Sequence, residues 1–212
     1  MEPLRPVVLE RLIRYHRYLS ELTARSSLHA ITSAQLGAAL DIDPTQVRKD
    51  FAAVGLTGIS RVGYEVCEVC RAIRVVFSFD HPHSAILVGT GRLGSTLLHC
   101  PVFARFGLRI VAAFDNDPAR IGTEIAGFQV RSARTMRAFV QKHHIPLAIL
   151  TIPEAASQRV TDRLVAAGVK VIWSFAPTRL AAPEGVLIRH EHFSLSLAHI
   201  AYHLNPYPAS TT

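Results

Sequence analysis

The stretch Ala85-Ile86-Leu87-Val88-Gly89-Thr90-Gly91-Arg92-Leu93-Gly94 decides the fold of this 212-residue chain. Its first four residues are apolar, and its last six have the pattern Gly-x-Gly-x-x-Gly. In this pattern a strand ends in a glycine turn that opens a helix. A second apolar run, residues 109–114, ends at Asp115, 21 residues after Gly94. This order of strand, turn, helix, strand and acid predicts a dinucleotide site in a Rossmann-type sheet.

Each residue type in this pattern has a physical role. Gly89 permits the tight turn, Gly91 lets the backbone approach a pyrophosphate, and Gly94 lets helix and strand pack closely. Backbone N–H groups and the helix dipole then hold the phosphates. Asp115 would accept hydrogen bonds from the ribose hydroxyls and repel a 2′-phosphate, which favours NAD(H) over NADP(H). The alternative is that Asp115 only caps the turn over residues 115–118.

Other candidates for the nucleotide site lie around the turn and at strand ends. Arg92 and Arg120 either reach phosphate or are ordinary solvated arginines. The carboxyl ends of parallel strands line the ligand crevice, although a proline there also serves as a simple strand stop. The remaining candidates are Thr90, Leu93, Asn116, Thr151, Pro153, Phe175 and Ala176.

Strands and helices alternate from Ser84 onward, which predicts a parallel sheet with crossover helices. A last apolar segment, residues 191–204, follows the sheet. The predicted strands cover residues 85–88, 109–114, 147–152 and 169–175, and the predicted helices cover residues 92–105, 132–143 and 154–167.

Some 80 residues precede the glycine turn, and their pattern is that of a winged helix-turn-helix. Residues 7–24 have apolar residues at helical spacing. Residues 34–40 form a short helix, and a second one begins after Asp43, a candidate N-cap, with Pro44 at its first position. The second helix is the expected DNA reader. Residues 55–64 suit a small wing, and residues 65–77 return to helix.

The candidates for contact with DNA lie on the reader helix, the first helix and the wing. The formal net charge is +7, but residues 1–80 hold 10 basic and 9 acidic residues, a balance of +1. DNA contact there therefore needs local clustering of charge. The alternative is that Arg48, Lys49 and Asp50 form an ordinary solvated helix face that does not contact DNA. The candidates are Arg14, Thr45, Gln46, Arg48, Lys49 and Arg61.

Other function classes have little support in the sequence. Cys67 and Cys70, one helical turn apart, are interpreted as small buried residues. His190 and His192 are interpreted as part of a polar linker rather than metal ligands. We assign no catalytic residue and no metal ligand, because no acid–base constellation stands out. With no apolar run of about 18 residues and no signal peptide, we expect a soluble, cytoplasmic protein.

The chain resembles the Rex family of redox-sensing transcriptional repressors over nearly its full length. The segments that carry the resemblance are Arg17-Tyr18-Leu19, residues 43–51, Val62-Gly63-Tyr64, residues 88–94, residues 113–118, residues 150–153 and Phe175-Ala176-Pro177.

The resemblance implies an α/β protein with three parts. These are a winged-helix DNA-binding domain (residues 1–80), a Rossmann NAD(H)-binding domain (84–190) and a C-terminal helix and tail (191–212). The helix is exchanged between the subunits of a homodimer. NADH would draw the two Rossmann domains together and move the winged helices off double-stranded operator DNA, whereas NAD+ would leave the DNA-bound form favoured. The implied protein is a repressor and not an enzyme.

The chain departs from the family pattern in three places. Ala53, Val54, Ile59 and Ser60 match positions where the family often has an aromatic and a basic pair, Arg92 replaces a usual asparagine, and His192 replaces an aspartate that starts the last helix. A histidine at that place predicts a pH-dependent response.

Two alternatives stay open at the level of sequence. One is an NAD- or CoA-linked oxidoreductase or ligase-like subunit with an accessory N-terminal domain. The other keeps the nucleotide site but uses the winged helix to dock a protein.

Overall fold

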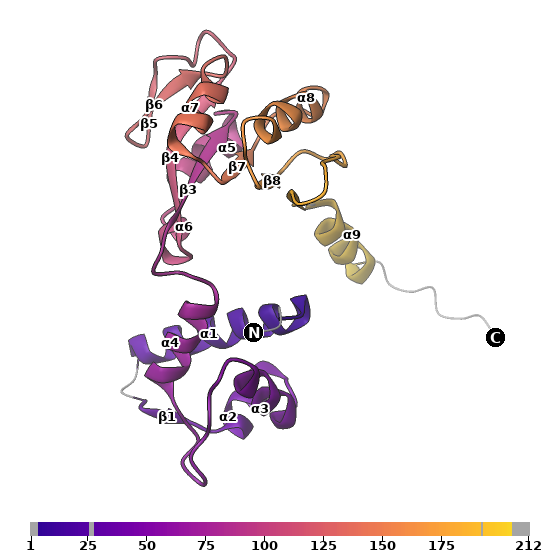
Figure 1. The fold of residues 1–212 in the computed structure, drawn as a ribbon. Helices are drawn as coiled ribbons and strands as arrows, with labels where there is room; N and C mark the ends of the chain where they lie inside the picture. The colour runs from indigo at the N-terminus through magenta and orange to yellow at the C-terminus, as the bar shows by residue number, and fades with distance from the viewer. Residues whose placement is uncertain (1–3, 26–27, 192, 205–212) are drawn as a thin grey trace, which may run out of the picture. The chain divides into compact units, whose positions relative to one another are not determined.

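The computed structural model describes residues 4–25, 28–191 and 193–204. The chain divides into two compact units, residues 1–81 and 82–212, here called the N-terminal and C-terminal units (Figure 1). The polar segment His81-Pro82-His83, which has exposed side chains, lies at the boundary.

The N-terminal unit is a winged helix-turn-helix, as predicted. The capping predicted for the second helix of the helix-turn-helix is confirmed, because the Asp43 carboxylate accepts hydrogen bonds from the Thr45 and Gln46 N–H groups at 2.7 and 3.2 Å. Pro44 is the first residue of that helix. The elements are α1 (Pro6–Arg25), β1 (Ala30–Ile31), α2 (Ser33–Leu40), α3 (Pro44–Ala53), β2 (Tyr64–Glu65) and α4 (Val66–Val76).

Aromatic rings join the elements of the N-terminal unit. Tyr15 of α1 meets Phe51 of α3 edge to face, with ring centroids 5.4 Å apart. Phe51 meets Tyr64 of β2 in the same way at 4.7 Å. All three side chains are buried, together with Leu12 and Leu19 of α1. Helix α3 is therefore fixed against both the first helix and the base of the wing.

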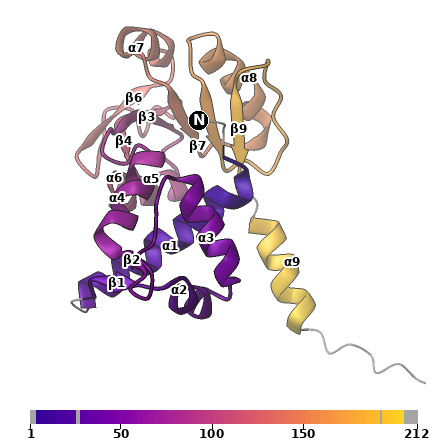
Figure 2. The same ribbon diagram turned by 60° about the horizontal axis from the view of Figure 1, so that its bottom comes forward.

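The C-terminal unit contains a seven-stranded sheet with the order β5-β6-β4-β3-β7-β8-β9 (Figure 2). All neighbouring strands are parallel except β5 and β6, which form an antiparallel hairpin. From β3 the chain first builds toward β6 and then returns to add β7 on the other side, so the order reverses between β3 and β7. The strands are β3 (His83–Val88), β4 (Leu108–Asp115), β5 (Glu124–Ile125), β6 (Phe128–Ser132), β7 (Leu147–Leu150), β8 (Val171–Ser174) and β9 (Leu187–His190).

Both faces of this sheet are buried, as a parallel sheet requires. Ile86 and Val88 point into one core, and Ala85 and Leu87 point into the other. The first core includes residues of α7 and α8, and the second includes residues of α5 and α6. The helices are α5 (Arg92–Leu98), α6 (Val102–Arg105), α7 (Met136–His143), α8 (Glu154–Val165) and α9 (Phe193–Leu204).

Several predicted boundaries are wrong. The single helix expected over 92–105 is two helices, because Pro101 interrupts it. The helix expected from 132 begins at Met136, since residues 128–132 form β6. Strands β5, β6 and β9 were not predicted, and the strand expected over 169–175 covers only residues 171–174.

The burial expected for the cysteine pair is also wrong in part. Cys67 is exposed and Cys70 is only partly buried, although both lie on α4 at the expected helical spacing. The buried stripe of α4 consists instead of Val66, Val69 and Ile73. His192 lies outside the described residues.

Candidate nucleotide site and DNA-reading surface

The glycine turn lies where the strand order of the sheet reverses. Gly89 follows the last residue of β3 and has a φ of +95°, a left-handed conformation that favours glycine. Thr151 follows the last residue of the adjacent β7. Its hydroxyl donates to the Gly89 carbonyl oxygen at 2.5 Å, and its N–H donates to the Val88 carbonyl oxygen at 3.0 Å. The carboxyl ends of β3 and β7 are thus joined at the edge where such sheets bind ligands.

Gly91 and Gly94 are glycines for different reasons. A Cβ atom at Gly94 would collide with the Gly89 carbonyl oxygen and lie 2.7 Å from Thr151 Oγ1. A Cβ atom at Gly91 would have no described atom within 4 Å. Packing within the chain therefore requires glycine at 94 but not at 91. The open side of Gly91, directly before α5, fits the close approach of a phosphate.

Asp115 is the hub of this turn. Its Oδ2 accepts hydrogen bonds from the N–H and hydroxyl of Thr90 at 2.7 and 2.8 Å. Its Oδ1 accepts from the N–H groups of Asn116 and Asp117 at 2.7 and 3.0 Å. The carboxylate therefore caps the turn that follows β4 and also holds the glycine turn. Burial opposes its ionisation, but these hydrogen bonds outweigh burial and hold the pKa of Asp115 below its ordinary value.

The two arginines predicted near phosphate differ in their surroundings. Arg120 donates from Nη1 to the Thr90 carbonyl oxygen and pairs with Asp117 at 3.4 Å, so it lies against the glycine turn. Arg92 is exposed, and its guanidinium makes no hydrogen bond or ion pair with the residues that the structure describes. Asp117 was not among the predicted site residues, although the spacing Asp-x-Asp-Pro after a strand is a turn signal.

The remaining predicted residues lie at the same edge of the sheet or beside the turn. Pro153 is exposed and immediately precedes α8. Phe175 and Ala176 follow β8, and the Ala176 N–H donates to the buried Ser174 hydroxyl at 3.2 Å. Leu93 and Asn116 are exposed beside the glycine turn.

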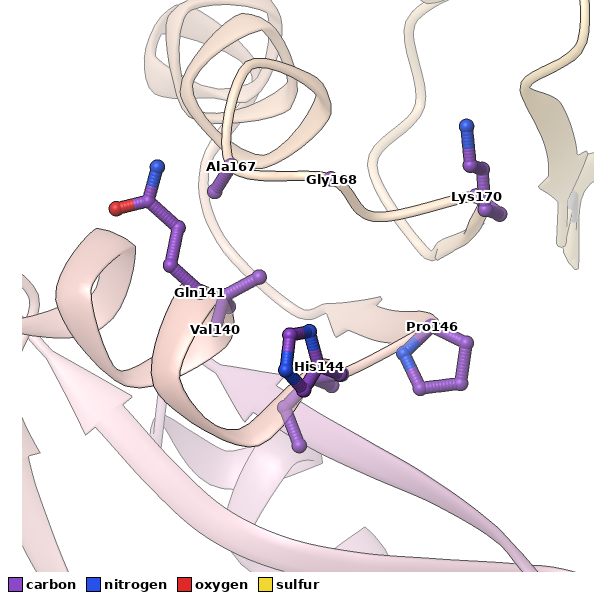
Figure 3. Close-up of a pocket in the computed structure, with 8 residues that line it drawn as sticks. Val140, Gln141, His144, Pro146, Ala167, Gly168 and Lys170 are labelled. Atoms are coloured by element: carbon purple, nitrogen blue, oxygen red, sulfur yellow. The ribbon is translucent and has the colours of Figure 1, made fainter.

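A hollow of about 450 Å³ lies at the opposite edge of the sheet (Figure 3). It is lined by Gln141 and His144 at the end of α7, by Pro146 before β7 and by Lys170 before β8. These positions are at the amino ends of the parallel strands. The hollow is therefore separate from the carboxyl-end crevice in which a dinucleotide would be held.

The exposed face of α3 carries three of the predicted DNA contacts. Thr45, Arg48 and Lys49 are exposed, whereas Val47 and Phe51 are buried. Arg48 donates to the Ser33 hydroxyl at 3.1 Å and to the Thr45 hydroxyl at 3.0 Å. The guanidinium of Arg48 is thus held between the starts of α2 and α3.

Gln46 has a second role, which the sequence did not reveal. Its side-chain amide donates to Asp50 Oδ1 at 2.8 Å. Asp50 is 1% exposed and also accepts from Arg11 at 2.6 and 2.7 Å and from the Tyr15 hydroxyl at 2.9 Å. Burial opposes ionisation, but the bonds from Arg11, Gln46 and Tyr15 hold the pKa of Asp50 below its ordinary value. This cluster ties α3 to α1.

The wing and α1 supply the other two predicted contacts. A bridge between Ile59 and Gly63 closes the wing, and Arg61 at its tip is exposed. Arg48 and Arg61 line one groove of about 270 Å³, which also touches Ser33. Arg14 is exposed on α1 and donates to the Leu40 carbonyl oxygen at the end of α2. The six candidates are therefore distributed over α1, α3 and the wing of one unit.

Each of the two units resembles a known protein family or domain. A model described as the CoA binding domain matches residues 80–178, and one described as a putative DNA-binding protein N-terminus matches residues 6–52. Redox-sensing transcriptional repressors named Rex, from Clostridioides difficile and Brevibacillus brevis, are each 35% identical to the chain. The alignment with the first relative covers 92% of the chain and 92% of that relative. The alignment with the second covers 96% of the chain and 98% of that relative. The chain belongs to the Rex family.

Solved structures of a Rex-family repressor, RSP, extend the likeness to three dimensions. RSP in complex with beta-NAD+ and operator DNA is 32% identical and matches with a TM-score of 0.91, over 97% of the chain and 94% of RSP. RSP in complex with beta-NADH is also 32% identical and matches with a TM-score of 0.86, over 97% and 96%. The predicted family and fold class are confirmed by these matches.

Within residues 4–25, 28–191 and 193–204, no helix combines the length and apolar character that a membrane span needs. In the same part of the chain, no three His, Cys, Asp or Glu side chains gather as a metal site would require.

Proposed function

We propose that the chain is a redox-sensing transcriptional repressor that binds operator DNA and releases it when NADH binds. The observation that carries the proposal is a helix-turn-helix unit followed by a dinucleotide turn whose middle glycine, Gly91, is left open to a ligand. The RSP structures with NADH, and with NAD+ and operator DNA, support it.

The nucleotide is expected to bind at the carboxyl ends of β3, β4, β7 and β8. Gly91 and the first N–H groups of α5 would hold the pyrophosphate, with Arg92 supplying positive charge. Asp115 would disfavour a 2′-phosphate, because its carboxylate is ionised and fixed at the end of β4. The residues that complete the crevice would be Thr90, Leu93, Asn116, Arg120, Thr151, Pro153, Phe175 and Ala176. When bound, the dinucleotide supplies a signal through its oxidation state, and no reaction is required of it.

The DNA is expected to bind the exposed side of α3. In a helix-turn-helix the second helix enters the major groove while other elements contact the backbone. Thr45, Arg48 and Lys49 would therefore face base edges or phosphates, with Gln46 held at the edge of this surface by Asp50. Arg61 on the wing and Arg14 on α1 would add contacts to the sugar-phosphate backbone.

The working form is proposed to be a homodimer in which α9 is exchanged between subunits. The apolar side chains of α9 support this, since they are 54–76% exposed. They are Leu195, Leu197, Ile200, Tyr202 and Leu204. A helix with so much exposed apolar surface needs a partner. A homodimer would also present two reader helices to two half-sites of the operator.

The domain limits proposed for this arrangement are 1–80, 84–190 and 191–212. The protein would act as a sensor and not as an enzyme, and it would work in the cytoplasm, where bacterial DNA is found. NADH would release the DNA because it has higher affinity for a form that does not fit the operator.

The proposal is tested by titrating the DNA upstream of the protein's own gene with the full chain at several salt concentrations. Tight binding at low salt that weakens linearly with the logarithm of salt concentration is expected. NADH should release the DNA, and NAD+ should compete with NADH. Coenzyme A serves as a third ligand, because a CoA binding domain model matches residues 80–178.

Three outcomes would reject the proposal. The first is the lack of DNA binding at low salt, which would favour a winged helix that docks a protein. The second is DNA binding that responds to coenzyme A but not to NADH, and the third is catalytic oxidation of NADH by a supplied electron acceptor. Either of the last two would favour an enzyme subunit.

A further inference from the structure

Two thiols on α4 are placed for chemistry that the proposed function does not use. Cys67 is exposed and is the second residue of α4, and Cys70 is partly buried one turn later. Residues three apart on a helix lie on the same face. Within the described residues, no third Cys, His, Asp or Glu joins them in a cluster that could hold a metal ion.

The surroundings give the two thiols different roles. The Arg71 guanidinium donates to Cys67 Sγ at 3.8 Å, so a cation lies beside the accessible sulfur. Burial, together with the neighbouring Cys67, raises the pKa of Cys70. Reactive cysteines are accessible to solvent and lie in positively charged surroundings. Cys67 is therefore suited to react first, and Cys70 to resolve the product.

We propose that Cys67 and Cys70 form a reversible disulfide when the protein meets a peroxide, and that this disulfide weakens the binding of operator DNA. The site would give the protein a second redox input, independent of the dinucleotide. The DNA part of this inference rests on the proposed function, whereas the thiol chemistry does not.

The reaction balances with one peroxide per pair of thiols. The Cys67 thiolate attacks one oxygen of hydrogen peroxide, the O–O bond breaks, and hydroxide leaves and is protonated to water. Cys67 is then a sulfenic acid. Cys70 sulfur attacks Cys67 sulfur, the S–S bond forms and the S–O bond breaks. The departing hydroxide takes the Cys70 proton and leaves as a second water. The two cysteines are oxidised, and the peroxide is reduced.

The disulfide cannot form without movement of the first turn of α4. Cβ atoms three residues apart on a helix are about 5–6 Å apart, whereas a disulfide needs about 3.5–4.5 Å. The first turn can yield because its N–H groups have no intrahelical partners, and Glu65 at the N-cap makes no side-chain capping bond. A disulfide formed with strain is also easily reduced, which suits a reversible switch.

Movement of this turn reaches the wing through short connections. Val66, next to Cys67, is 1% exposed, and its N–H donates to the His29 carbonyl oxygen at 2.9 Å. Strand β2 directly precedes Val66, and its Tyr64 pairs with Ile31 of β1, while the wing leads into β2. A shift at Cys67 therefore acts on the strand that supports the wing and on the core under α3.

The test uses the full-length protein, hydrogen peroxide as oxidant and the DNA upstream of its own gene. Binding of the reduced protein to this DNA is measured first. Peptide mapping then identifies the disulfide, and a thiol assay follows its rate of formation. We expect a Cys67–Cys70 disulfide, DNA affinity about tenfold lower after oxidation, and recovery with dithiothreitol. Cys100→Ser is the matched control, because it removes the third thiol, and it should behave as the wild type.

The variants separate the outcomes. Cys67→Ser and Cys70→Ala should bind DNA as the reduced wild type does and keep that affinity in peroxide, and Arg71→Gln should slow oxidation. Circular dichroism checks that each variant folds. No Cys67–Cys70 disulfide in the oxidised wild type would overturn the proposal, as would a disulfide that leaves DNA affinity unchanged. If the reduced protein does not bind DNA, the proposed function fails, and the thiol assay still decides the chemistry.

Discussion

Asp50 is ionised inside the N-terminal unit because three side chains donate to it. Arg11 is its ion-pair partner, and the Arg11 side chain is 17% exposed to solvent. Asparagine would remove the charge and replace one of the two acceptor oxygens with an NH2 group, so Arg11, Gln46 and Tyr15 would lose part of the hydrogen bonding that they now make to Asp50. We expect Asp50→Asn to lower the free energy of unfolding by about 2–3 kcal/mol, below the values for fully buried pairs because Arg11 retains some contact with water. Urea unfolding at neutral pH measures this loss.

The same carboxylate predicts a pH dependence. Its pKa is lower in the folded chain than the ordinary value of 3.8, so the folded state binds its proton less readily than the unfolded state. The stabilisation is fully present above that ordinary value and is lost as pH falls through the folded pKa. We expect wild-type stability to fall steeply below about pH 4, and Asp50→Asn to show a shallower fall. Equal slopes for both proteins would contradict this role for Asp50.

Gly91 and Gly94 predict two different kinds of variant. Gly91→Ala adds a methyl group on the open side, so thermal stability should stay near that of the wild type while NADH affinity falls strongly. Gly94→Ala forces the Gly89 carbonyl and Thr151 apart and should lower the free energy of unfolding by about 1–3 kcal/mol. Thermal unfolding and NADH titration are measured on both. Unchanged NADH affinity in Gly91→Ala would place the pyrophosphate elsewhere.

At the scale of the element, the proposed contact between α3 and DNA can be tested by the salt dependence of DNA binding. Lys49 is exposed on α3 and has no structural partner among the described residues. Lys49→Ala should weaken DNA binding and reduce the dependence of the logarithm of affinity on the logarithm of salt concentration by about 1. Lys142→Ala, which removes an exposed lysine of α7, is the matched control and should leave both quantities unchanged. An unchanged slope for Lys49→Ala would mean that Lys49 does not contact phosphate.

The elements that sequence predicted well have strong local signals. Asp43 and Pro44 mark the start of α3, and Gly89, Gly91 and Gly94 mark the turn between β3 and α5. The strands missed by the prediction are two to five residues long, and they lie at or near the sheet edges, where burial imposes little pattern.

The parts of the site that sequence could not predict depend on contacts between distant residues. Asp50 is 39 residues from Arg11 and 35 from Tyr15, so no local pattern announces that they meet. The bonds from Thr90 to Asp115 likewise span 25 residues. Asp115 could be predicted as an acid at the end of β4, but its task in holding the glycine turn could not.

At the scale of the whole molecule, the proposed switch must obey thermodynamic reciprocity between its two ligands. If NADH lowers the affinity for operator DNA by some factor, operator DNA must lower the affinity for NADH by the same factor. We expect the two factors to agree when NADH is titrated with and without saturating DNA, and DNA is titrated with and without saturating NADH. A scrambled DNA of equal length and salt conditions is the control. Unequal factors would mean that NADH and DNA compete at one site or that a further species forms.

The four hydrogen bonds to Asp115 have a consequence for changes of cofactor preference. Asp115, which we propose to disfavour a 2′-phosphate, also connects β4 to the turn after β3 through these hydrogen bonds. A designer who replaced Asp115 with a small neutral residue to admit NADP(H) would leave Thr90 without its acceptor and loosen the turn. Redesign would have to change Thr90 together with Asp115. The choice of cofactor and the stability of the glycine turn therefore cannot be changed independently at Asp115.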